Sequence, residues 1–205
     1  MNADHDRNLE QAIDALLDNV YWAWNYYFAL EGLHEEYNAS PISFAHVPSL
    51  TTCFWHALFD ALFAKSGQLI DRKQNVRSVH YLFKLIRRYR PEDTEMLRQI
   101  EEHERALDVR ANTIAKRIAN WRNQVVAHLS VKGLNDSFFE ENRIALPEFK
   151  AFLEQFDGVV QFYSKAILNR TNDTITGALK QKRDVHDLFR GAVGEPSAAA
   201  DTMPH

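Results

Sequence analysis

Apolar residues recur at intervals of three and four through most of this chain, and this spacing restricts the fold more than any other feature. Such spacing places side chains along one face of an α-helix. Turn-forming residues are scarce, because the 205 residues include only 7 glycines and 6 prolines. A sandwich or barrel of many short strands needs many more turns. We therefore expect an all-α protein.

The periodic segments predict a series of helices with short connections. Two helix starts are marked by Pro48 and Pro91, because proline is tolerated in the first turn of a helix. Pro91 also ends the helix before it, since a residue that precedes proline is kept out of helical conformation. The expected helical ranges are 6–36, 48–67, 75–89, 91–130, 146–167 and 172–189.

The fourth of these ranges has two interpretations. As a single rod it would hold roughly 39 residues and measure about 58 Å at 1.5 Å per residue. A break near 107–110 is the alternative. The region between Asn135 and Ala145 is expected to be a loop.

The domain organisation follows from where these helices stop. Residues 1–170 are expected to form one up-and-down bundle of four to five helices, and residues 171–190 a short C-terminal helix. Residues 191–205 are rich in Gly, Pro, Ser and Ala, which cannot bury enough surface to become ordered. We expect a disordered tail there.

Composition and charge exclude several classes of protein. The net charge is −4, so any nucleic-acid binding has to come from a local basic patch. No apolar run reaches the roughly 18–20 residues of a membrane span, and the first residues lack a signal-peptide pattern. The single cysteine, Cys53, excludes an internal disulfide framework. We expect a cytoplasmic protein without a membrane partner.

Metal and cofactor motifs are missing from the sequence. A His-Glu-x-x-His helix and cysteine pairs are absent, and Glu31-Gly-Leu-His34 is one Glu-x-x-His pair where a di-iron bundle needs two. No phosphate-binding glycine loop is present, and Cys53 is expected to be a small buried thiol. The prediction is that no metal and no cofactor is used.

A local basic patch is found in the region 105–132. Ile118, Trp121 and Val125 belong to the apolar stripe of this helix, whereas Arg122 and His128 lie off the stripe, so burial does not explain them. The patch contains six basic residues and one acidic residue, Asp108. The basic residues are Arg105, Arg110, Lys116, Arg117, Arg122 and Lys132.

The segment Trp121-Arg122-Asn123-Gln-Val-Val-Ala-His128-Leu resembles the signature of the HEPN superfamily, an arginine and a histidine four to six residues apart. Its flanking residues are similar to the branch found in bacterial abortive-infection systems, so the expected setting is bacterial defence or a toxin–antitoxin system. The resemblance covers about residues 9–169. It implies a helical bundle of four to five helices and a homodimer that cleaves RNA without a metal.

The resemblance also implies roles for individual residues. Arg122 would bind phosphate, His128 would transfer protons and Asn123 would support them, which suits a guanidinium fork and an imidazole that titrates near neutral pH. Lys116, Arg117 and Lys132 would guide the RNA backbone. On a regular helix, Arg122 and His128 would lie about 120° apart around the axis and about 9 Å apart along it. Either the helix is distorted or two protomers share the site across a two-fold axis.

Structural readings of the same residues remain open. Arg122 could be paired with an acidic neighbour, His128 could cap the end of its helix, and Asn123 could be structural. The basic run 84–90 is more consistent with a solvated helix end than with an RNA groove. Aromatic residues around the first helix fit full burial, a subunit interface or base stacking. The alternative function is a non-catalytic module that binds a nucleotide, RNA or a protein such as an antitoxin.

Overall fold

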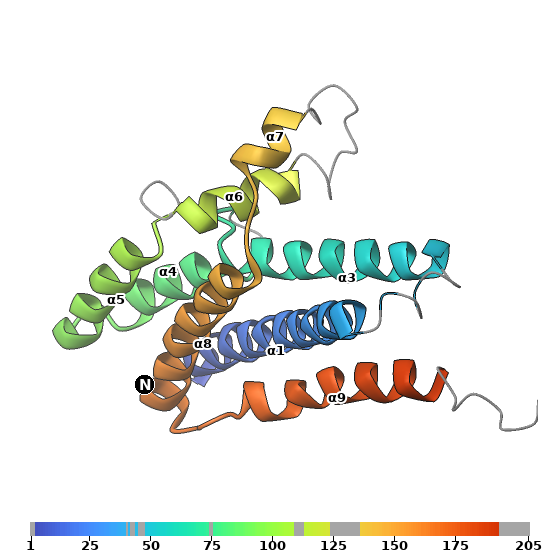
Figure 1. Ribbon diagram of the computed structural model, residues 1–205. Coiled ribbons are helices and arrows are strands. Elements are labelled where there is room, and N and C mark those ends of the chain that lie inside the picture. The colour runs from blue at the N-terminus through green and yellow to red at the C-terminus, as the bar shows by residue number, and fades with distance from the viewer. Residues whose placement is uncertain are drawn as a thin grey trace, which may run out of the picture.

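The computed structural model describes residues 3–39, 41, 44, 48–73, 76–108, 113–123 and 136–192. Within these ranges every regular element is helical and no strand is found, which confirms the all-α prediction (Figure 1). The helices are α1 (Ala3–Ala39), α3 (Pro48–Leu69), α4 (Val79–Tyr89), α5 (Thr94–Ala106), α6 (Thr113–Trp121), α7 (Asp136–Glu141), α8 (Leu146–Leu168) and α9 (Thr174–Ala192).

Helix α1 is the central element of the bundle. It contacts α3, α4, α8 and α9, and Figure 1 shows it between α3 and α9. Trp24, Tyr27 and Phe28 are buried, and so are Asn25 and Leu30 between and beyond them. Burial therefore explains three of the six aromatic residues at 21–28, and Tyr21 and Tyr26 are partly buried. Trp22 differs, because 41% of its surface is exposed.

A buried hydrogen-bond network joins α1, α8 and α9. The Trp24 indole Nε1 donates to Asp157 Oδ2 at 3.2 Å, and the Thr174 hydroxyl donates to the same oxygen at 2.6 Å. The Gln161 amide donates to Asp157 Oδ1 at 3.1 Å. Asp157 is only 6% exposed, so these donors satisfy a carboxylate that has little access to water. The network fixes the start of α9 against α1 and α8.

Helix α9 packs along α1 through charged contacts on its outer side. Lys182 lies between Glu31 and Glu35, with its ammonium 3.0 and 2.6 Å from their carboxylate oxygens, and His186 contacts Glu36. The predicted short C-terminal helix is therefore found, and it is a member of the bundle that extends to Ala192. The predicted tail, apart from 191–192, lies outside the described residues.

The rod expected over 91–130 is broken after Ala106, at the alternative position given by the sequence. Leu107 closes α5 by donating from its N–H to the His103 carbonyl at 2.9 Å, and α6 begins at Thr113. Helix α4 begins at Val79, later than residue 75, because the Ser78 hydroxyl accepts from the Tyr81 N–H and caps it.

The region 135–145 departs from its prediction, because α7 lies where a loop was expected. The following helix α8 begins at Leu146 as predicted. The Glu148 carboxylate accepts from the Ala145 N–H at 2.9 Å, which satisfies one of the free donors at the start of a helix.

The basic run 84–90 contributes to packing between helices. The guanidinium of Arg87 forms a two-point contact with Glu104 of α5, at 2.8 and 2.7 Å. Arg90 approaches Asp6 of α1 at 3.7 Å. These contacts agree with a helix end that is partly solvated and partly paired. Among the described helices, none is both long and apolar enough to cross a membrane.

Replacing Asp157 with alanine should destabilise the fold by about 2–3 kcal/mol, because the Trp24 and Thr174 donors would be buried without an acceptor. Denaturant unfolding followed by circular dichroism measures this change. Glu154→Ala is the matched control, since this carboxylate lies on the same helix and is exposed. Equal losses in the two variants would show that the buried network does not support the bundle.

Candidate functional site

The described part of the motif ends just beyond α6. Arg122 and Asn123 follow Trp121 in π-helical geometry, so the regular α-helix is distorted at the motif arginine. Distortion was one of the two explanations offered by the sequence. His128 and Lys132 lie outside the described residues, and their expected roles remain predictions.

Trp121 anchors the end of α6 on the bundle. Its ring packs at 5.1 and 5.4 Å, centroid to centroid, from the rings of Phe59 and Phe63 on α3. The indole Nε1 donates to the carbonyl of Asn142 at 2.7 Å, and Asn120 donates to the Asn142 side chain at 2.8 Å. These contacts place the next residue, Arg122, over the C-terminal end of α3.

Arg122 is bound to a buried carboxylate. Its Nη1 donates to Asp71 Oδ2 at 2.6 Å and lies 3.5 Å from the carbonyl oxygen of Gly67. The Arg122 side chain is 26% exposed, whereas that of Asp71 is 5% exposed. Pairing with an acidic residue was one of the readings of Arg122, and it is found. The partner is 51 positions away in the sequence, at the end of α3.

Gly67 provides the space that Arg122 occupies. A Cβ atom at this position would lie 2.3 Å from Arg122 Cδ and within 3.3 Å of its Cβ and Cγ. Real Cβ atoms do not approach other heavy atoms at 2.3 Å, so any larger residue would displace the arginine stem or shift α3. A glycine therefore lets Arg122 cross α3 and reach Asp71.

Asp71 is held in its ionised form. Burial alone would raise the pKa of this carboxyl. The Lys73 N–H, which donates to Asp71 Oδ1 at 2.8 Å, and the Arg122 guanidinium outweigh burial and lower the pKa below its ordinary value. Both carboxylate oxygens are thus engaged, and the negative charge persists throughout the neutral pH range.

Arg122 lines two neighbouring cavities of about 360 and 350 Å³. It therefore stands where a ligand in either cavity could reach its guanidinium. The first cavity is also lined by Gly67, Ile70, Asp71, Arg72, Lys73, Ala119 and Asn123. The second is also lined by Ala15, Asp18, Asn19, Gln68, Val76 and Arg77. Asn123 is exposed and lies beside Arg122 as the sequence predicts.

The two basic residues expected to guide RNA from α6 lie in different environments. Lys116 is exposed. Arg117 is paired with Glu148 at 2.8 Å and also donates to the carbonyl of Arg143, which attaches α6 to the start of α8. A structural contact therefore occupies Arg117, whereas Lys116 faces solvent.

Sequence reasoning missed Gly67, Asp71, Arg72 and Lys73, which surround Arg122 in space. The run Asp71-Arg72-Lys73 directly after an apolar helix was the visible signal. Its connection with Arg122 depends on how α6 crosses α3, and local patterns do not reveal such a crossing.

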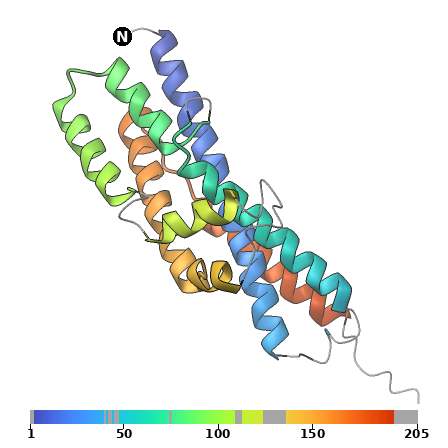
Figure 2. The same ribbon diagram turned by 90° about the horizontal axis from the view of Figure 1, so that it is seen from above.

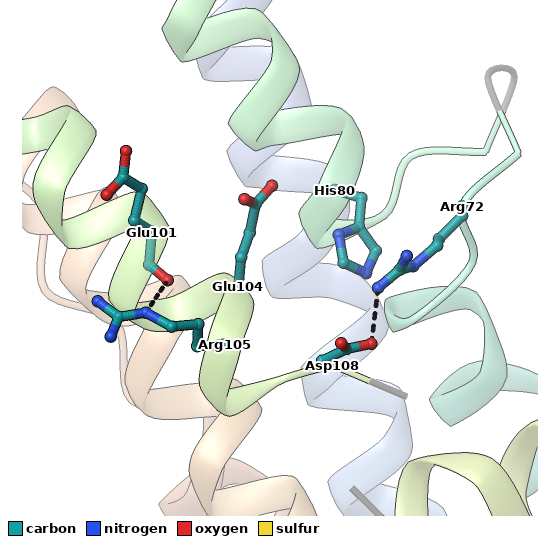
Figure 3. A pocket seen from close by; sticks show the side chains of 6 residues that line it. All are labelled: Arg72, His80, Glu101, Glu104, Arg105 and Asp108. Atoms are coloured by element: carbon teal, nitrogen blue, oxygen red, sulfur yellow. Dashed lines mark hydrogen bonds and ion pairs between the residues drawn. The ribbon is translucent and has the colours of Figure 1, made fainter. Parts of the chain in front are cut away.

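A further cavity, of about 560 Å³, lies between α4 and α5 (Figure 3). It is lined by Arg72, His80, Glu101, Glu104, Arg105 and Asp108. Arg72 pairs with Asp108 at 3.1 Å, and the two side chains lie beside the His80 ring in Figure 3. Among the described residues, no group of three or more His, Cys, Asp or Glu side chains could hold a metal ion.

His80 is half-buried in this cavity wall, and its Nε2 has no hydrogen-bond partner among the described residues. Burial and the nearby Arg72 charge lower the pKa of His80 below its ordinary value. The folded state therefore favours the neutral imidazole.

Acidification should destabilise the protein in part through His80. The unfolded chain protonates His80 more readily than the folded protein does. The contribution of neutral His80 to the free energy of unfolding is therefore complete above about pH 6.5, and it is lost as the pH falls from there through the lower pKa of the folded state. The dependence of the unfolding free energy on pH between 7 and 5 should be less steep in His80→Gln. Exposed His56 on α3 provides the control variant His56→Gln, with an unchanged slope. An unchanged slope in His80→Gln would contradict the assignment.

Comparison with known proteins gives one informative match. No curated protein and no solved structure matches this chain. A family model for HEPN AbiU2 proteins, described as AbiU2, matches residues 6–188. This range includes most of the bundle, with α9 up to residue 188, together with the motif around Arg122. The chain therefore belongs to the AbiU2 abortive-infection branch of the HEPN family.

Proposed function

We propose that this protein is a metal-independent endoribonuclease that cleaves single-stranded RNA in a bacterial abortive-infection or toxin–antitoxin system and works in the cytoplasm. The observation that carries the proposal is the placement of Arg122. A motif arginine of a HEPN protein is tethered through one nitrogen at the wall of two cavities, with a quarter of its side chain exposed.

The reaction is an internal transfer at phosphorus. The 2′-hydroxyl of one nucleotide loses its proton to a base and attacks the adjacent phosphate. The bond from phosphorus to the 5′-oxygen of the next nucleotide breaks, and that oxygen takes a proton from an acid. The products are a 2′,3′-cyclic phosphate and a free 5′-hydroxyl. Negative charge grows on the phosphate oxygens during the transfer, so a fixed guanidinium accelerates it.

The residues divide these tasks. Arg122 stabilises the charge on the phosphate, His128 transfers protons near neutral pH, and Asn123 supports them from the adjacent position. Lys116 and Lys132 guide the RNA backbone. Arg117, paired with Glu148, contributes through the placement of α6 and adds to the local positive field.

A homodimer completes the site in this proposal. On a regular helix, the six positions between Arg122 and His128 would leave the two side chains about 120° apart around the axis, so one protomer would not bring both to one phosphate. Two protomers related by a two-fold axis would bring a second copy of each residue to the same cleft. RNA then binds between protomers.

The ion pair with Asp71 favours one alternative function. An arginine held by a buried carboxylate could orient a bound nucleotide or RNA strand without any bond being broken, as in a non-catalytic binding module. An antitoxin protein could then be the partner that covers this surface. Purified protein that retards RNA in a gel without shortening it, in the presence or absence of a chelator, would support this alternative.

Replacing His128 with alanine should reduce cleavage of single-stranded RNA by about a hundredfold to ten-thousandfold, because proton transfer would be left to water. Cleavage is measured on a labelled oligonucleotide, with product ends analysed for the cyclic phosphate. His56→Ala removes an exposed histidine of α3 and should retain full activity. Full activity in His128→Ala would refute the proposed role of His128.

A further inference from the structure

We propose that residues 71–73, the segment directly after α3, form a phosphate-binding subsite together with Arg122. In this subsite, Lys73 contacts a backbone phosphate of the RNA and Asp71 positions Arg122. The inference rests on the proposed function for its substrate, a single-stranded RNA. It adds a phosphate contact and a positioning residue that lie outside the Arg122–His128 motif.

The segment turns its side chains in two directions. Asp71 is 7% exposed and points into the protein toward Arg122, whereas Lys73 is exposed. The hydrogen bond from the Lys73 N–H to Asp71 Oδ1 fixes this turn. Lys73 and Arg122 consequently line the same cavity of about 360 Å³, a size within the range of small-molecule sites.

Asp71 restrains Arg122 while leaving most of its donors available. A guanidinium carries five N–H groups. Arg122 makes two hydrogen bonds with the described residues, and it donates both of them from Nη1. The hydrogens on Nε and Nη2 therefore remain for a two-point contact with a phosphate, which is the arrangement that arginine favours. A restrained guanidinium also loses less conformational entropy on binding than a free one.

The charges around the cavity suit a phosphodiester. The negative charge of Asp71 is balanced by Arg122. The positive charge of Arg72 is balanced by Asp108, in the wall of the cavity of about 560 Å³. Lys73 supplies the remaining positive charge. A phosphodiester carries one negative charge, so Lys73 can balance it while Arg122 binds its oxygens.

Binding tests the phosphate contact without requiring cleavage. The probe is a single-stranded RNA oligonucleotide with 2′-O-methyl groups, which lacks the attacking hydroxyl, and its affinity for the full-length protein is measured at several salt concentrations. Lys73→Ala should weaken binding about fivefold at low salt and reduce the salt slope by about one ion. Lys150→Ala removes an exposed lysine of α8 and should change neither quantity.

Cleavage kinetics test the positioning role. Asp71→Asn should lower kcat about tenfold to a hundredfold with little change in KM, because the guanidinium would lose its fixed place. This variant removes a negative charge, so a merely electrostatic role of Asp71 predicts tighter RNA binding with kcat unchanged. In an Arg122→Ala background the same substitution should have no further effect on kcat.

Gly67→Ala provides an independent displacement of Arg122 and should lower kcat in the same way. The matched control is Gly158→Ala, because a Cβ at that helical position meets no heavy atom within 4 Å. Thermal unfolding of each variant confirms that the compared proteins are folded at the assay temperature.

The outcomes separate this inference from the proposed function. Unchanged probe binding in Lys73→Ala overturns the phosphate contact, and unchanged kcat in Asp71→Asn and Gly67→Ala overturns the positioning role. If the wild-type protein cleaves no RNA while Lys73→Ala still weakens probe binding, the proposed nuclease function fails and the phosphate subsite stands.

Discussion

The ion pair between Arg122 and Asp71 is the interaction on which the candidate site depends. It joins the end of α6 to the end of α3, and it exists only because Gly67 leaves room for the arginine stem. A buried carboxylate is unfavourable without partners. Arg122 therefore stabilises the charge of Asp71, and Asp71 in turn restrains the guanidinium of Arg122. The pair therefore links the placement of the motif arginine to the packing of two helices.

The bundle supplies the rigid support for this pair. Helix α1 contacts α3, α4, α8 and α9, and Figure 1 and Figure 2 show α3, α8 and α9 arranged around it. Phe59 and Phe63 of α3 pack against Trp121, and this aromatic contact holds the end of α6 on the bundle. Arg122 follows as the next residue. Stability of the core and geometry of the site are thus connected through a single tryptophan.

Sequence reasoning predicted the helices well because helical periodicity is a local property. It located the start of α8, gave the break near 107–110 as an alternative to a single rod, and singled out Arg122 with Asn123. It missed α7, which is too short to show a period, and expected Cys53 to be buried although this residue is exposed. Asp71 and Gly67 were missed for a different reason, since their contacts with Arg122 bridge more than fifty residues.

The central proposal is that two protomers bring their copies of Arg122 and His128 to one cleft, where Arg122 of one protomer acts with His128 of its partner. Mixing inactive Arg122→Ala and His128→Ala proteins, with subunit exchange, tests it directly. Each mixed dimer would hold one complete site, so RNA cleavage should return to about a quarter of the wild-type rate, given that half of the dimers are mixed. Mixtures that stay as inactive as either variant alone would contradict a site shared between protomers.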